Sequence, residues 1–382
     1  MTLVNSERSG QPSTDRIYHL ISADSHVNEP PTLWVDRVPT ALRDRVPRME
    51  HFDEGDAWIV EGVNGPMPLG LNACAGQEPR LRQAWVHFED IRAGGYNPAA
   101  RVIEIDRAGI DAEVLYPTPR LAMAIYATTD PVLHIALVRA YNDWIAEYAD
   151  YDLQRFRALP IVPNRGQEGA LAEIDRVGDR PSTGGFLMGA YPGGTLEPQP
   201  DDDAVIARIA ERGVPLNIHV SLSLNMPFIM SPTALPAGNG AGRVTAASDQ
   251  LTNLIFSGVF DRIPDLKVVF AEVDCGWVPY IKEQMDDGFQ RYRFRFNLRH
   301  LPSEYIEQHA HFTYVSDTYG IDNRYRIGVD RILWSSDYPH GNSNYPDAWS
   351  PLQASLAGVP HAERALIMAG NAIRLYGFGR RP

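Results

Sequence analysis

The feature that most constrains the fold of this chain is an alternation of short apolar runs with longer amphipathic stretches. Runs such as LKVVFAE and RILWSSD are nearly continuous in Val, Ile, Leu and Phe, which is typical of parallel strands buried on both faces. Strands are expected at 18–23, 112–117, 157–162, 184–189, 215–220, 266–272, 312–316 and 331–337. Eight βα units favour a closed (β/α)8 TIM barrel over an open doubly wound sheet, so the predicted fold class is α/β.

The amphipathic stretches predict the helices that would cover this barrel. Their ranges are 131–150, 168–178, 202–212, 245–260, 276–292, 321–327 and 361–377. Residues 18–382 are expected to form this single domain. The polar residues 1–17 are expected to form a flexible N-terminal tail.

Two insertions interrupt the alternation of strands and helices, at about 31–100 after the first strand and 221–244 after the fifth. The first contains DAWIVEGVNGPMPLG, a hairpin pattern in which Asn64-Gly65 suits a tight turn. Both leave from the carboxyl ends of strands, where loops form the mouth of a barrel. We therefore expect these two insertions to build a substrate pocket or a lid.

Composition limits the partners. The formal net charge is −13, and lysine is scarce, with only Lys267 and Lys282. An acidic surface repels nucleic acid and anionic membranes, so a small-molecule substrate is the expected partner. A homodimer or higher homo-oligomer is expected, because dimers are the commonest assembly. Cys74 and Cys275 lie far apart and the N-terminal stretch is polar, so we expect a cytoplasmic protein without disulfides or thiolate metal sites.

The end of the first strand, ISADSHVNEPP, carries the strongest functional signal. Asp24 and His26 are two residues apart, so both side chains point to the same face of an extended strand. Burying them is costly unless each has a charged or metal partner. Metal ligation is the favoured interpretation, and an ordinary buried ion pair is the alternative.

Two other strand ends should reach the same place. The fifth strand, PLNIHV, delivers His219, which on its own would more often be a satisfied core residue. The eighth, RILWSSDYPHGN, ends in Asp337, followed three residues later by His340. A carboxylate there can bind a metal, take a proton from its bound water, or both. Such nitrogen and oxygen ligands suit Zn, Mn or Fe, and one ion is favoured over two.

The sequence resembles the amidohydrolase-related barrels in four places: the DSH start, His219, the segment LIFSGVFDRIPDLKVVFAE and the WSSDYPH end. These barrels are typified by aminocarboxymuconate-semialdehyde decarboxylase and the resorcylate decarboxylases, and the resemblance spans about residues 18–377. It implies that a metal is bound by Asp24, His26, His219 and Asp337. Asp24 stands where many relatives have His or Glu.

The sixth strand departs from that pattern. Where the decarboxylases usually carry a histidine that acts on substrate, this chain has Glu272 in VVFAEVDCGW. Glu272 is a candidate general base, metal ligand or acceptor that orients a histidine, and the alternative is a buried carboxylate paired with an arginine. With Glu29 and His340 it could gather a second metal, or the three could simply line the pocket. The fourth strand offers no lysine for carboxylation, so carboxylate or water would have to bridge a second ion.

Thr118, Arg120 and Trp277 are candidate substrate contacts. Thr118 and Arg120 follow the second strand in YPTPR, and an arginine near the mouth offers a bidentate fork for a carboxylate. A surface-loop role is the alternative for these two. For Trp277 the alternative is packing of its helix.

Hydrolysis is the favoured function, because Glu272 departs from the decarboxylase pattern. A metal would lower the pKa of a bound water towards ~7, Asp337 or Glu272 would accept its proton, and the hydroxide would attack an amide, ester or related carbon. The same acid or His340 would protonate the leaving group. The alternatives are non-oxidative metal-dependent decarboxylation of an aromatic or dienoic acid, a di-iron monooxygenase with Glu29 and His340 as extra ligands, and a non-enzymatic scaffold.

Overall fold

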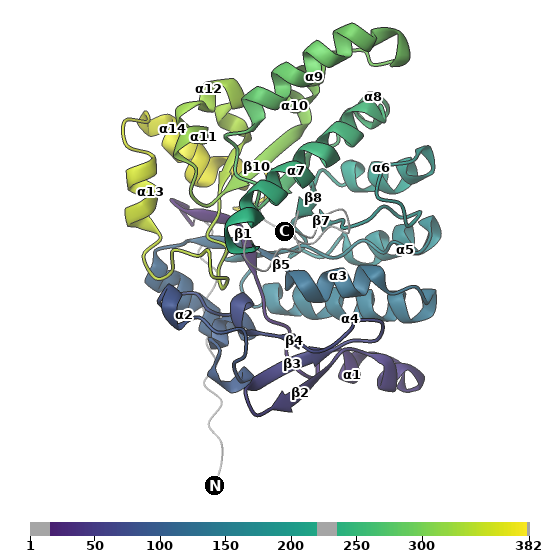
Figure 1. Ribbon diagram of the computed structural model, residues 1–382, viewed down its shortest axis with the longest axis vertical. Coiled ribbons are helices and arrows are strands. Elements are labelled where there is room, and N and C mark those ends of the chain that lie inside the picture. Colours follow the sequence, from purple (N-terminus) through teal and green to yellow (C-terminus); the bar gives the residue numbers. More distant parts are fainter. Residues whose placement is uncertain (1–15, 220–234, 380–382) are drawn as a thin grey trace.

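Parallel strands form the centre of the computed structural model, which describes residues 16–219 and 235–379 (Figure 1). The barrel strands in these ranges are β1 (Ile21–His26), β5 (Ala112–Tyr116), β6 (Phe156–Ala158), β7 (Phe186–Leu187), β8 (Leu216–His219), β9 (Val268–Ala271), β10 (Ala310–Tyr314) and β11 (Ile332–Trp334). Every residue in them is buried, which explains their nearly continuous apolar sequences. The predicted α/β fold is confirmed, and each expected apolar run overlaps one of these strands.

Backbone hydrogen bonds join the strands into a closed barrel. β1, β5 and β6 pair in parallel, as do β7 to β11 in chain order, and two parallel bridges connect β6 to β7. The chain after β11 closes the ring on β1. Asp337 N donates to Asp24 O at 3.0 Å, and His26 N donates to Tyr338 O at 2.6 Å. This closure brings the end of the eighth barrel strand against the end of the first.

Helices cover the outside of the barrel (Figure 1). They are α2 (Pro98–Ala108), α3 (Pro119–Ala127), α4 (Pro131–Asp150), α5 (Gln167–Val177), α6 (Asp203–Glu211), α7 (Leu235–Phe256), α8 (Val259–Arg262), α9 (Val278–Tyr292), α10 (Pro302–His309), α11 (Thr318–Asp322), α12 (Arg324–Ile327), α13 (Trp349–Ser355), α14 (His361–Ala365), the π-helical η10 (Leu366–Gly370) and α15 (Asn371–Tyr376). Within the described ranges, no helix is long and apolar enough to cross a membrane. The predicted helices at 131–150, 168–178, 202–212 and 276–292 match α4, α5, α6 and α9 closely.

Between β1 and α2 the chain forms a small antiparallel sheet and several short helices. The strands are β2 (Arg48–Phe52), β3 (Gly55–Ile59) and β4 (Met67–Pro68), in the order β2-β3-β4, and the helices are α1 (Leu33–Arg37), η1 (Thr40–Arg45), η2 (Gly70–Asn72), η3 (Pro79–Leu81), η4 (Phe88–Asp90) and η5 (Ala93–Gly95). β3 and β4 pair antiparallel, as the hairpin pattern predicts. Their connection is longer than a two-residue turn, although Gly65 within it adopts a φ of 77°.

Helix α7 begins earlier than the sequence suggests. Residues 235–244 were expected to belong to the insertion at 221–244, but α7 already starts at Leu235. The glycines of LPAGNGAGR each disfavour a helix by about 1 kcal/mol, and this masked the start. Buried Leu251 and Leu254 further along α7 supply the packing that stabilises the whole helix. The rest of that insertion, 221–234, and most of the predicted tail at 1–17 lie outside the described residues.

Candidate metal centre

Ligand atoms from three barrel strands converge at the carboxyl ends of β1, β8 and β11. His26 Nε2 lies 3.4 Å from Asp24 Oδ1, 3.5 Å from Asp337 Oδ1 and 3.2 Å from His219 Nε2. All four side chains are fully buried. Bonds of about 2.1 Å to one tetrahedral ion would set neighbouring ligand atoms about 3.4 Å apart. His26 Nε2 has about that spacing from the other three, and His219 Nε2 lies 3.7 Å from Asp24 Oδ1. We call these four side chains the metal cluster.

The carboxylates of the metal cluster need a cation. Both oxygens of Asp24 are buried and accept no hydrogen bond from any residue that the structure describes. Burial, and then the negative charges of Asp337 and Glu272, raise the pKa of Asp24 well above its ordinary value. A buried carboxylate without a partner is strongly destabilising when ionised. A divalent ion would remove that penalty, so the donor set fits a metal.

The histidines of the metal cluster are in the form that ligation requires. His26 Nδ1 lies 2.7 Å from Pro117 O and therefore donates its proton to that carbonyl, which leaves the Nε2 lone pair facing the carboxylates. Burial lowers the pKa of His26 well below its ordinary value and lowers the pKa of His219 to about 4. Both rings are therefore neutral at physiological pH, and a neutral imidazole is the metal-binding form.

His340 lies at the edge of the metal cluster. Its Nδ1 is 2.8 Å from Asp337 Oδ1, and its ring stacks on His26 with a centroid distance of 3.9 Å. Burial disfavours the charged ring, but the Asp337 carboxylate outweighs this and raises the pKa of His340 above its ordinary value. His340 therefore holds its proton more tightly than a free histidine, directly beside the cluster.

Glu272 follows β9 and connects the metal cluster to α7. Its Oε2 lies 3.5 Å from His219 Nε2, and its Oε1 accepts from Arg243 Nη1 at 2.7 Å. The arginine pairing, one of the alternatives drawn from the sequence, is thus observed. Sequence reasoning missed Arg243, which lies in the stretch interpreted as an insertion and carries no periodic signal.

Two of these acidic residues have strained backbones. Glu272, directly after β9, adopts a φ of 60°, and Asp337, three residues after β11, adopts a φ of 50°. Non-glycine residues rarely adopt this left-handed conformation, and such strain is concentrated at functional sites. The strain aims both carboxylates into the barrel mouth, which fits a chemical role for this position.

The second metal site considered for Glu29, Glu272 and His340 gains no geometric support. Among the described residues, their ligand atoms do not form one group, whereas Asp24, His26 and His219 form one and His26, Asp337 and His340 another. Both groups share His26. One ion therefore fits this arrangement better than two.

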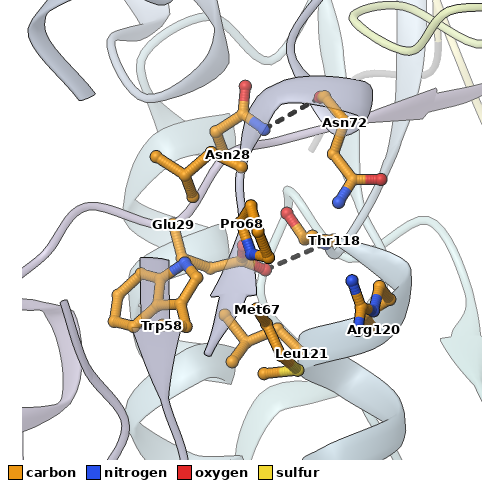
Figure 2. Close-up of a pocket in the computed structure, with 10 residues that line it drawn as sticks. Asn28, Glu29, Trp58, Met67, Pro68, Asn72, Thr118, Arg120 and Leu121 are labelled. Carbon is orange, nitrogen blue, oxygen red and sulfur yellow. Dashed lines mark hydrogen bonds between the residues drawn. The ribbon is translucent and has the colours of Figure 1, made fainter. Parts of the chain in front are cut away.

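The three candidate substrate contacts lie in two places. Thr118 precedes α3 and Arg120 lies in its first turn, so they occupy the start of a helix rather than a loop. Both line a pocket with Glu29, whose Oε1 accepts from Thr118 N at 3.0 Å (Figure 2). Trp277 instead donates from its indole nitrogen to Val273 O at 3.0 Å and packs edge-on against Phe312. These contacts are those of the packing alternative for Trp277.

Comparison with known proteins gives matches to a family model, to curated relatives and to solved structures. The amidohydrolase family model matches residues 23–378. Gamma-resorcylate decarboxylase from Rhizobium sp. (strain MTP-10005) is 25% identical over 292 residues, which cover 71% of this chain and 84% of that enzyme. The crystal structure of an amidohydrolase from Mycobacterium avium subsp. paratuberculosis K-10 has 25% identity and a TM-score of 0.73, covering 95% of this chain and 100% of that one.

A dihydroxybenzoic acid decarboxylase from Polaromonas sp. JS666, solved with bound manganese and the inhibitor 2-nitroresorcinol, has a TM-score of 0.66. Its sequence is 19% identical, and the match covers 96% of this chain and 98% of that one. At this identity the likeness establishes a shared fold.

Proposed function

This chain belongs to the amidohydrolase family, and from that premise we propose that it is a metal-dependent, non-oxidative decarboxylase of small aromatic acids. The observation that carries the proposal is the metal cluster, in which two histidines and two aspartates converge and both oxygens of Asp24 accept no hydrogen bond from the described residues. Curated relatives that match over most of their length are gamma-resorcylate decarboxylases. The proposal reverses the preference for hydrolysis drawn from the sequence.

In this proposal Asp24, His26, His219 and Asp337 hold one divalent ion. Manganese is the first ion to test, because the Polaromonas decarboxylase binds it. When bound, the ion supplies positive charge that attracts the substrate carboxylate and the oxygen next to it. The ion pair between Arg243 and Glu272 keeps the Glu272 carboxylate beside His219 Nε2, next to the metal cluster.

His340 is the proposed proton donor. Loss of carbon dioxide leaves the electrons of the broken bond on the ring carbon, which must then receive a proton. His340 holds a proton against Asp337 at 2.8 Å and lies at the edge of the metal cluster. Its position beside the ion would let it deliver that proton to the carbon that had carried the carboxylate. Arg120 and Thr118 are proposed to contact the polar groups of the substrate.

The test is turnover of a panel of mono- and dihydroxybenzoic acids by manganese-loaded protein, with carbon dioxide and the phenol product both quantified. We expect the two products in equal amounts, without consumption of dioxygen. Activity should disappear after chelation and in Asp337→Asn. The exposed control variant Asp53→Asn should retain it. Failure of the metal-loaded protein to release carbon dioxide from any acid of the panel would overturn the proposal.

Hydrolysis is the second candidate, and Glu272 is the observation that favours it. This carboxylate approaches the metal cluster at 3.5 Å from His219 Nε2, where the resembling decarboxylases usually carry a histidine. The same preparation should therefore be tested on esters and amides in water enriched in ¹⁸O. Hydrolysis would place one ¹⁸O atom in the acid product, whereas decarboxylation would place none in the phenol.

A further inference from the structure

A small pocket lies between the β3–β4 hairpin and the start of α3 (Figure 2). Trp58, Met67, Leu69 and Leu121 provide apolar walls, and Glu29 is the acidic residue in the lining. Glu29 lies three residues beyond His26 on the chain that leaves β1. In the proposal below, the far side of a substrate held at the metal cluster reaches this pocket.

Glu29 presents one free oxygen to this pocket. The residue is only 2% exposed, and its Oε1 is occupied by the backbone N–H of Thr118 at 3.0 Å. Its Oε2 is buried and accepts no hydrogen bond from any described part of the chain. A buried acceptor without a donor destabilises the empty site, and a ligand that supplies the donor would recover this free energy.

The charges around the pocket limit what that donor can be. Glu29 would repel a carboxylate or phosphate, while Arg120 in the same lining would repel an ammonium group. A neutral hydroxyl meets neither repulsion and can donate to Glu29 Oε2. The pocket has a volume of about 10 Å³, which is room for one water-sized group such as a hydroxyl, so the ring that carries the hydroxyl would lie outside it.

We propose that this pocket is a specificity subsite, in which Glu29 Oε2 accepts a hydrogen bond from a hydroxyl on the aromatic ring, on the side away from the reacting carboxylate. The inference rests on the proposed function, because it takes the ligand to be an aromatic acid. It assigns Glu29 to substrate selection rather than to a second metal. If Glu29 only capped the start of α3 through Thr118, its second oxygen would have no effect on ligand choice.

Glu29→Gln separates these roles. The amide oxygen can still accept from Thr118 N, while the amide NH2 replaces the free acceptor with a donor. The probes are 2-hydroxybenzoic acids that carry hydroxyl, methoxy or hydrogen at the distal ring position. The matched control is Glu89→Gln, which makes the same chemical change at an exposed glutamate.

For the wild-type protein and Glu89→Gln, we expect kcat/KM to favour the distal hydroxyl over hydrogen by about 100-fold, near the upper end of the effect of leaving one buried acceptor unpaired. In Glu29→Gln this ratio should fall at least ~10-fold, and the methoxy acid should gain, because methoxy only accepts hydrogen bonds. An unchanged ratio in a folded Glu29→Gln protein that still turns over the acids would overturn the subsite and leave the proposed function standing.

Equilibrium binding of the corresponding phenols, measured by calorimetry, keeps the test independent of turnover. One outcome is that the wild-type protein binds hydroxyl-bearing phenols selectively, Glu29→Gln loses this selectivity, and no acid releases carbon dioxide. That outcome would support the subsite and overturn the decarboxylase. Absence of both turnover and selective phenol binding would overturn both proposals.

Discussion

At the scale of single residues, the chemistry depends on how burial changes protonation. Burial raises the pKa of Asp24 and lowers the pKa values of His26 and His219, because it disfavours the charged form of each side chain. His340 departs from this rule, since the carboxylate of Asp337 at 2.8 Å outweighs burial and raises the pKa of His340 above its ordinary value. The site therefore combines neutral metal-binding imidazoles with one imidazole that can donate a proton.

Replacement of His340 tests this division of roles. In His340→Asn, kcat should fall by about 10²–10⁴-fold, the usual contribution of a positioned proton donor. Metal content should stay near that of the wild-type protein, because Asp24, His26, His219 and Asp337 remain. Steady-state kinetics and elemental analysis of the same preparation measure both. If His340→Asn lost its metal together with its activity, His340 would instead be a metal ligand.

His134 provides a residue-scale prediction about stability. It is buried, its Nδ1 lies 3.0 Å from Ile125 O, and its Nε2 accepts from Asn164 N at 3.1 Å. Burial lowers its pKa to about 4. Because a histidine in the unfolded chain has a pKa of about 6.5, the unfolded state binds more protons between these values. Stability is therefore lost as the pH falls from about 6.5 towards 4.

We expect His134 to contribute a loss of about 2 kcal/mol between pH 6.5 and 5. This contribution should be missing from His134→Gln, whose amide does not titrate. Urea unfolding at several pH values measures the difference between the two proteins. Parallel pH profiles for wild type and variant would contradict the assignment, whatever their absolute stabilities.

At the scale of elements, a buried arginine joins α2 to the strands that carry the metal cluster. Arg101 donates from Nε to Glu113 Oε2 at 2.6 Å, and from Nη1 to His26 O at 3.0 Å. Its guanidinium also stacks on the ring of Tyr338, at 4.2 Å from the centroid. One side chain thus connects α2, β5, the end of β1 and the segment after β11.

Arg101→Met should lower the free energy of unfolding by about 3–5 kcal/mol, because it leaves Glu113 buried without its cation. The double variant Arg101→Met/Glu113→Leu should recover part of this loss, since it removes the uncompensated charge as well. Denaturant midpoints of the three proteins test the prediction. If the double variant were less stable than Arg101→Met, the pair would matter for packing rather than for charge.

The elements also explain what could be predicted from the sequence. The barrel strands were predictable because parallel strands buried on both faces need continuous apolar runs, as in β9 and β11. The carboxyl ends of barrel strands meet at one mouth, so the residues of the metal cluster were predictable as neighbours: Asp24, His26, His219 and Asp337. Both inferences use local pattern and a general rule of topology.

Contacts between distant elements were not predictable in this way. Arg243 reaches Glu272 from α7, a helix whose glycine-rich start hid it from propensity. Arg101 was not singled out from the sequence, although it is fully buried. Glu29 was grouped with metal ligands because it follows His26 closely, but the chain turns it towards Thr118 instead.

At the scale of the whole molecule, the metal cluster spans the two sheets that make up the barrel. β1 belongs to the sheet β1-β5-β6, while β8 and β11 belong to the five-stranded sheet. One ion held by Asp24, His219 and Asp337 would therefore link both sheets. Its removal should affect the stability of the entire barrel, because it leaves two buried carboxylates facing each other.

We expect chelation to lower Tm by several degrees, since an ion at 100 times its Kd stabilises the folded state by about 2.7 kcal/mol. Manganese should restore Tm in the wild-type protein but not in Asp24→Asn. Without metal, Asp24→Asn should melt above the wild type, because it removes one of the repelling charges. Differential scanning calorimetry measures all four states.

An equal rise in Tm with manganese in both proteins would place the stabilising ion elsewhere. The more exposed group of His51, Asp56 and His87 is the other candidate that the described residues provide. There Asp56 Oδ1 lies 2.8 Å from His51 Nδ1 and 3.3 Å from His87 Nδ1. His51→Ala would remove a rise caused by that group and leave one caused by the metal cluster, so the pair of variants assigns the effect to one site.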